Sequence, residues 1–117
     1  MRPRRYVPAR GDAVWVSLSP QAGREQAGRR PAVIVSPLPY NAKVGLAVAC
    51  PITSRVKGYP FEVVIPAGLG VAGAVLSDHV RSLDWRARKV EFICRLPQQT
   101  LVEVIQKLGT LISLEES

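Results

Sequence analysis

The stretch CPITSRVKGYPFEVVI, residues 50–65, carries apolar residues toward its two ends and a polar, turn-rich segment between them. β-Branched and aromatic side chains favour extended strands, whereas Gly, Pro and Ser interrupt them. The stretch therefore predicts the end of one β-strand, a loop over residues 54–60, and a further strand that begins near Phe61.

The same pattern repeats on both sides of this stretch. Short runs rich in Val or Ile, each ended by Gly, Pro, Asn or Ser, occupy residues 13–18, 32–36, 46–52, 61–65, 73–76 and 90–96. Their apolar and polar residues alternate imperfectly, as expected where a small sheet curls and buries both faces of a strand. The pattern predicts a mainly β fold, either a compact barrel or a strongly bent sheet, with further loops over residues 19–29, 38–45 and 66–72.

One helix is expected, at the end of the chain. Its apolar residues recur at helical spacing on one face and are Leu101, Ile105, Leu108 and Ile112. Pro97 suits the first turn of a helix, where a missing N–H costs nothing. Val102 and Val104 widen the apolar stripe, so we expect this helix to pack on the sheet.

Length and composition indicate a single domain over residues 1–117. The chain is 47% hydrophobic and 21% charged, which is ordinary for a globular protein. A chain of this length buries roughly two-thirds of its unfolded surface. It has no apolar run near the roughly 20 residues that span a bilayer, and no apolar stretch follows its basic N-terminus. We therefore expect a cytoplasmic protein with no membrane contact.

The cysteines show no sign of a metal site or a disulfide bond. Cys50 and Cys94 lie far apart and lack the CxxC or Cys/His spacing of zinc sites. In a reducing compartment two such cysteines need no bridge, and we expect both to be small buried apolar residues. No other cluster of His, Cys, Asp and Glu has convincing metal spacing, so neither a metal nor another cofactor is expected.

The net charge of +7 indicates attraction to polyanions. Residues 1–97 hold fifteen Lys and Arg against six Asp and Glu, whereas residues 98–117 hold one Lys against three Glu. The basic surface therefore belongs to the body of the domain. Charge alone does not separate nucleic-acid binding from simple solubility.

Four segments resemble signature segments of the MazF/PemK toxin family and occur in family order. They are RYVPARGDAVWVSLSP (5–20), GREQAGRRPAVIVSP (23–37), CPITSRVKGYPFEVVI (50–65) and VLSDHVRSLDWRAR (75–88). The resemblance implies a small SH3-like β-barrel of curved antiparallel strands with a C-terminal helix, acting as a homodimer. It also implies sequence-specific, metal-independent cleavage of single-stranded RNA to 2′,3′-cyclic phosphate and 5′-hydroxyl ends, and inhibition by a cognate antitoxin.

The resemblance also assigns candidate catalytic residues. Arg30 matches the family's catalytic arginine, whose planar guanidinium can make two N–H bonds to phosphate oxygens as charge builds. Thr53 matches the catalytic threonine, whose hydroxyl can donate to a phosphate oxygen or orient the ribose. Glu25 matches an acidic loop position, where it could accept the 2′-hydroxyl proton or fix Arg30 by pairing with it.

Further cations are candidates for phosphate binding along a groove of the dimer, namely Arg24, Arg29, Arg55, Lys57 and Arg86. Tyr59, Phe61 and Trp15 are equally suited to the core or to base stacking. His79 is the single histidine, so two histidines cannot act as acid and base within one chain, and an ordinary strand or surface role is expected for it. Departures from better-known relatives, which leave the cut sequence open, fall at Arg24, Arg29, Ser54, Arg55 and Val56.

Two alternatives remain at this point. The same barrel resembles that of toxins that poison DNA gyrase, although the ending Leu114-Glu115-Glu116-Ser117 lacks the Trp-Gly-Ile tail of those toxins. A basic nucleic-acid-binding barrel without catalysis is the other alternative.

Overall fold

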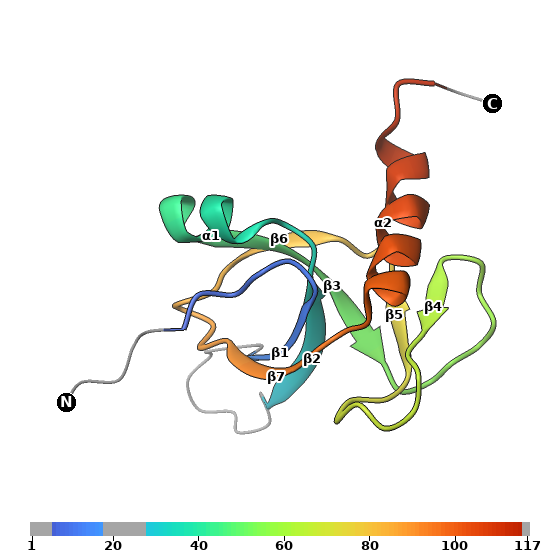
Figure 1. The fold of residues 1–117 in the computed structure, drawn as a ribbon, viewed down its shortest axis with the longest axis horizontal. Coiled ribbons are helices and arrows are strands. Elements are labelled where there is room, and N and C mark those ends of the chain that lie inside the picture. Colours follow the sequence, from blue (N-terminus) through green and yellow to red (C-terminus); the bar gives the residue numbers. More distant parts are fainter. Residues whose placement is uncertain (1–5, 18–27, 116–117) are drawn as a thin grey trace.

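The computed structural model describes residues 6–17 and 28–115, and these fold into seven strands and two helices (Figure 1). In chain order the elements are β1 (Asp12–Ser17), β2 (Arg29–Ile34), α1 (Leu38–Val44), β3 (Leu46–Thr53), β4 (Glu62–Val64), β5 (Ala74–Leu76), β6 (Arg81–Asp84), β7 (Glu91–Arg95) and α2 (Gln98–Ile112).

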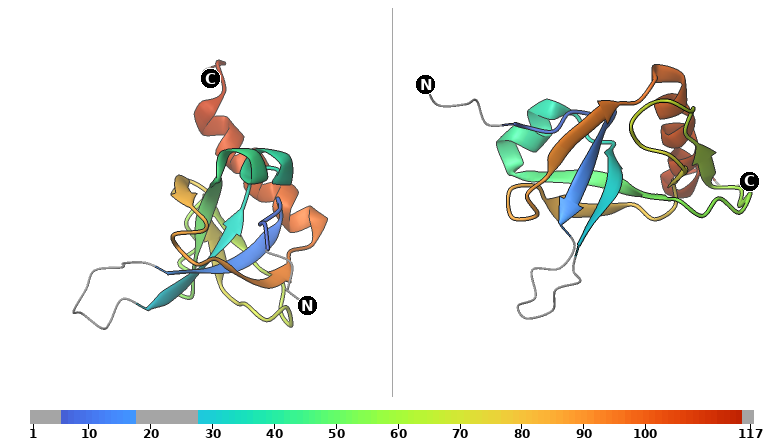
Figure 2. Two further views of the ribbon diagram at one scale, coloured as in Figure 1. Left: turned by 90° about the vertical axis from the view of Figure 1, so that its left-hand side faces the viewer. Right: turned by 90° about the horizontal axis from the view of Figure 1, so that it is seen from below.

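The strands form one antiparallel sheet in the order β4-β5-β3-β2-β1-β7, and β6 also pairs with β3. The first half of β3 pairs with β6 and its last two residues, Ile52 and Thr53, pair with β5. The sheet curves strongly without closing, and the described parts of β4 and β7 form its two ends (Figures 1 and 2). The expectation of a mainly β fold with a curved antiparallel sheet and a C-terminal helix is confirmed.

Both faces of the central strands are buried, which explains the imperfect alternation in the sequence. In and after β2, Val33 and Val35 belong to a core shared with Val104 and Leu108 of α2. Ile34 belongs to a second core, which packs around Trp85 on the other face. A strand between two cores needs apolar residues at successive positions, not at every second one.

Only the first part of α2 packs as predicted. Its buried residues are Thr100, Leu101, Val104 and Leu108. Ile105 and Ile112 are exposed, Ile112 by 73%, and Val102, which was expected to widen the stripe, is 40% exposed, so the prediction that these three residues pack on the sheet is wrong. The last turns of α2 extend beyond the sheet, which therefore cannot cover them (Figure 1).

Two elements differ from the sequence-based expectation. Residues 38–45 were expected to be a loop but form α1, whose buried Asn41 donates from Nδ2 to the carbonyls of Pro8 at 2.8 Å and Ser36 at 3.0 Å. Asn41 thus links α1 to the segments that contain Pro8 and Ser36. The strand β6 was missed because Leu83 is its one buried side chain, so its sequence shows no alternation.

Both cysteines are free, as expected, but only Cys50 is fully buried. Cys94 is partly exposed because it lies on β7, at an end of the sheet. No helix in the described part of the chain is long and apolar enough to cross a membrane.

Candidate active site

Arg30 and Thr53 lie at the same end of the ladder between β2 and β3. The paired residues are Ala32 with Pro51, Val33 with Cys50 and Ile34 with Ala49. The pairing ends at Ala32 and Pro51, and two residues further along the two strands stand Arg30 in β2 and Thr53, the last residue of β3. Two residues that are 23 positions apart in the sequence therefore lie at the same end of this strand pair.

Thr53 is held firmly at this end. It pairs with Ala74 of β5, and its Oγ1 accepts a hydrogen bond from the backbone N–H of Arg55 at 3.1 Å. The hydroxyl proton is thus left to donate elsewhere. Gly73 packs so closely behind that a Cβ there would lie 2.0 Å from the Thr53 carbonyl oxygen.

A hollow of about 420 Å³ opens beside Thr53. Its walls include Arg55, Lys57 and Tyr59 from the loop of residues 54–60, together with His79. We call it the Thr53 hollow. Two exposed cations and a threonine hydroxyl at one opening suit a phosphate.

The loop of residues 54–60 is fastened at two points. The buried carboxylate of Glu62 accepts hydrogen bonds from the backbone N–H groups of Lys57 at 3.0 Å and Gly58 at 2.9 Å. From α2, Nζ of Lys107 donates to the carbonyls of Pro60 at 2.6 Å and Glu62 at 3.3 Å. The cations of the loop are therefore carried on a fixed frame.

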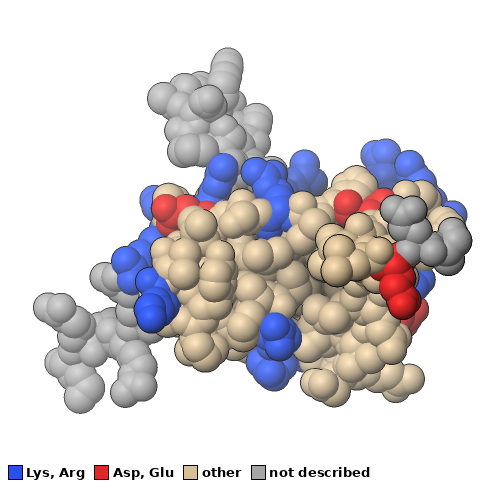
Figure 3. Space-filling model, turned by 90° about the horizontal axis from the view of Figure 1, so that it is seen from above, with Lys and Arg blue, Asp and Glu red and all other residues tan. Residues whose placement is uncertain are grey.

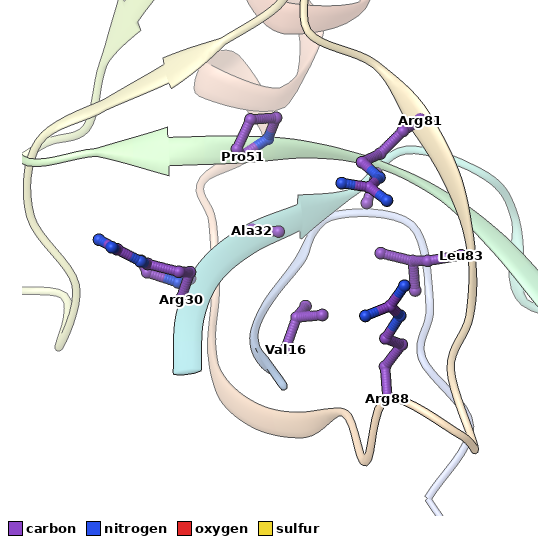
Figure 4. A pocket seen from close by; sticks show the side chains of 9 residues that line it. Val16, Arg30, Ala32, Pro51, Arg81, Leu83 and Arg88 are labelled. Atoms are coloured by element: carbon purple, nitrogen blue, oxygen red, sulfur yellow. The ribbon is translucent and has the colours of Figure 1, made fainter. Parts of the chain in front are cut away.

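A second hollow of about 160 Å³ has Arg30 in its wall, and we call it the arginine hollow. Figure 4 shows Arg81 and Arg88 directed over an apolar floor that includes Val16 and Leu83, while the guanidinium of Arg30 extends away from both. Sequence reasoning missed Arg81 and Arg88. Both stand in the family-like segment of residues 75–88, but only the fold brings them to Arg30.

The other predicted RNA-binding residues are not gathered in one place. Arg29 pairs with Glu91 and lies over the Trp15 ring, 5.3 Å from its centroid. Arg86 lies 4.9 Å from the ring centroid of its neighbour Trp85. Both belong to the segment between β6 and β7, which lies at the opposite end of the molecule from the segment between β3 and β4 (Figure 1). Of the predicted set, the structure brings Arg55 and Lys57 to Thr53. Arg24 and the catalytic candidate Glu25 lie outside the described residues.

Asp78 contacts two of the residues that line the Thr53 hollow, Tyr59 and His79. The hydroxyl of Tyr59 donates to Oδ2 of Asp78 at 2.7 Å, and this hydrogen bond raises the pKa of Tyr59. On the other side, Nε2 of His79 lies 3.7 Å from Oδ1 of Asp78. Among residues 6–17 and 28–115, no three His, Cys, Asp or Glu side chains are grouped as metal ligands.

The charge is unevenly distributed over the surface. Seen from the side of the two helices, Lys and Arg gather around the margin while the area between them is largely uncharged (Figure 3). Exposed apolar side chains of α1 and α2, among them Leu38, Val44 and Leu111, contribute to the uncharged surface of the molecule.

Comparison with known proteins identifies the family. The model for PemK-like, MazF-like toxins of type II toxin–antitoxin systems matches residues 9–112. The endoribonuclease toxin MazF of Escherichia coli is 52% identical over 108 residues, which cover 92% of this chain and 96% of that protein. The gyrase alternative finds no support in these matches.

Solved structures agree. MazF from Deinococcus radiodurans is 56% identical, with a TM-score of 0.84 over 94% of this chain and 100% of that one. A MazE–MazF complex from the same organism gives a TM-score of 0.85 at 51% identity, covering 94% of this chain and 100% of that one. On sequence, fold and family model together, the chain belongs to the PemK-like, MazF-like toxins of type II toxin–antitoxin systems.

Proposed function

We propose that this endoribonuclease toxin cuts single-stranded RNA at the end of the β2–β3 strand pair where Arg30 and Thr53 lie, with no metal ion in the reaction. The endoribonuclease activity follows from family membership and from the 52% identity to an endoribonuclease toxin. The observation that supports this placement of the chemistry is the β2–β3 register, which brings Arg30 and Thr53 to the same end of the two strands.

The proposed reaction is an internal transfer at phosphorus. The ribose 2′-oxygen loses its proton and bonds to the adjacent phosphorus, the bond from phosphorus to the 5′-oxygen breaks, and that oxygen takes up a proton. The products are a 2′,3′-cyclic phosphate and a 5′-hydroxyl. Arg30 donates two N–H bonds to the phosphate oxygens as negative charge grows, and Thr53 donates its hydroxyl to the same group. Glu25 either accepts the 2′-hydroxyl proton or holds Arg30.

The substrate would run between the two hollows. Arg30 borders the arginine hollow, and Thr53 borders the Thr53 hollow. A strand crossing from one to the other meets Arg81 and Arg88 on one side of the scissile phosphate and Arg55 and Lys57 on the other. Cations along such a path bind the backbone without reading its sequence.

A homodimer and an antitoxin complete the proposal. The exposed apolar side chains of α1 and α2 suit contact with a second copy of the chain. The D. radiodurans complex of MazE with MazF supports a cognate antitoxin as the second partner. Because RNA and antitoxin are met inside the cell, we place this activity in the cytoplasm.

The test uses purified protein and total RNA. In excess EDTA we expect cleavage of single-stranded RNA at a short sequence, and mapping the 5′-hydroxyl ends identifies that sequence. A duplex carrying the same site should resist, because A-form pairing keeps the 2′-hydroxyl from swinging in line with the leaving oxygen. Loss of cutting on chelation, restored by added metal, would overturn the metal-free mechanism.

A further inference from the structure

Tyr59 is an exposed aromatic side chain that the fold holds in one orientation. It is 45% exposed, yet its hydroxyl donates to Oδ2 of Asp78 at 2.7 Å. Its ring centroid lies 6.0 Å from that of Phe61. Because the hydroxyl is bound to Asp78 and the ring contacts Phe61, the side chain loses little conformational entropy when another planar group stacks on the exposed face of the ring.

Asp78 supports both rings at this opening. One carboxylate oxygen accepts from Tyr59, and the other is buried with no hydrogen-bond partner in the described residues, 3.7 Å from Nε2 of His79. Tyr59 and His79 both line the Thr53 hollow. Two aromatic rings, one of them anchored, therefore border the hollow that contains Thr53.

The residues around Tyr59 in the Thr53 hollow are of the kinds found in protein sites that bind unpaired nucleotides. Such sites combine aromatic platforms, on which bases stack, with cations that follow the phosphates. Here Arg55 and Lys57 supply the cations from the same loop as Tyr59. The volume of about 420 Å³ lies within the range of roughly 300–1,000 Å³ typical of small-molecule sites.

We propose that Tyr59 is a specificity-determining residue, on whose ring one unpaired base beside the scissile phosphate stacks inside the Thr53 hollow. This rests on the proposed function, because it takes Thr53 as the position of that phosphate. A base is favoured over a side chain of a protein partner because Thr53 and Tyr59 line one hollow, so a nucleotide whose phosphate lies at Thr53 has its base within that space.

The test removes bases from the substrate one at a time. In a cleavable oligonucleotide, each nucleotide in turn is replaced by an abasic one, and kcat/KM is measured for the wild type, Tyr59→Ala, Tyr59→Leu, Tyr59→Phe and Phe92→Ala. For the wild type we expect one position next to the cut where removing the base lowers kcat/KM roughly 5- to 150-fold. In Tyr59→Ala and Tyr59→Leu the intact substrate should lose a similar factor, and the abasic change at that position should cost almost nothing more.

The other two variants are controls. Tyr59→Phe keeps the ring and should retain most of the dependence on that base. Phe92 is a matched aromatic control, since it is 52% exposed and lies on β7, outside the residues that line the Thr53 hollow. Thermal unfolding checks that each variant is folded, and Tyr59→Leu keeps more of the lost volume if Tyr59→Ala unfolds.

Three results would overturn the stacking role. One is an unchanged kcat/KM of both Tyr59→Ala and Tyr59→Leu on the intact substrate. Another is an abasic penalty in these variants equal to that of the wild type at every position. The third is normal RNA cleavage by them together with weakened antitoxin binding, which would assign the ring to a protein partner. A wild-type protein that cuts no RNA would instead overturn the proposed function itself.

Discussion

Arg30 and Thr53 carry different parts of the proposed reaction, so their replacement should have separable effects. Arg30→Ala removes a preorganised donor aimed at the developing charge and should slow cleavage by roughly 10² to 10³. Thr53→Ala should also slow it strongly. Single-turnover cleavage of a defined oligonucleotide measures both rates.

Matched controls exist for both positions. Lys43 is an exposed cation on α1 outside both hollows, and Thr110 is an exposed threonine of α2 that bonds within its own helix. Lys43→Ala and Thr110→Ala should cut at nearly the wild-type rate. Equal losses in the controls and the candidates, with all proteins folded, would contradict the assignment of Arg30 and Thr53.

Cys50 gives a residue-level prediction about pH. Burial is the main cause that raises the pKa of its thiol from 9.0 to about 11. The folded state therefore holds the proton more tightly than the unfolded state, and stability should fall as the pH rises from 9 toward 11. Urea unfolding should show a smaller loss over this range for Cys50→Ala, even if that variant is less stable at neutral pH. Burial also raises the pKa of Tyr6, which contributes the same pH dependence to the wild type and to Cys50→Ala. If the free energy of unfolding fell equally with pH in the two proteins, this role of Cys50 would be contradicted.

Among the elements, the junction of β3 and β5 depends on Gly73. This residue has a φ of +117°, and an added Cβ would lie 2.0 Å from the Thr53 carbonyl oxygen. Gly73→Ala should cost more than the roughly 1–2 kcal/mol of the backbone strain alone, and it should lower the cleavage rate by moving Thr53. Chemical unfolding and single-turnover cleavage measure the two effects.

Gly45 allows the cost of backbone strain at positive φ to be measured without a steric clash of the added Cβ. It has a φ of +84°, but an added Cβ would meet nothing within 4 Å. Gly45→Ala should therefore lose only the strain energy and keep its cleavage rate. If both variants lost the same stability and the same activity, close packing against Thr53 would not be the cause.

The sequence predicted elements whose residues follow a local pattern, and it failed where a distant contact decides. The strands around Val33 and Ile52 and the start of α2 were found because their own residues are apolar. Helix α1 was missed because Asn41 is buried by Pro8 and Trp85, which are remote in the sequence. Arg30 and Thr53 were found through family resemblance, whereas Arg81 needed the fold to bring β6 beside β3.

At the scale of the whole molecule, the protein attracts polyanions, because its net charge is +7 and Lys and Arg side chains gather around the margin of one face (Figure 3). An acidic, disordered antitoxin segment that covers Arg30 and the loop of residues 54–60 would compete with RNA for these cations. We expect the Arg30→Ala variant to bind a substrate oligonucleotide when free and to fail when saturated with antitoxin. Fluorescence anisotropy of a labelled oligonucleotide measures this, and antitoxin affinity should weaken as salt rises. Simultaneous binding with no loss of affinity would show that inhibition acts at a distance.

The contacts that hold the loop of residues 54–60 in place allow its side chains to vary. Glu62 and Lys107 bind backbone atoms of the loop, so their contacts do not depend on which side chains stand at positions 54–56. Substitutions at Ser54, Arg55 and Val56 can therefore accumulate without altering the frame, whereas a change of loop length would break it. The side chains at these three positions can thus change one at a time while the backbone contacts of the loop persist, so that each variant remains a folded protein on which selection can act.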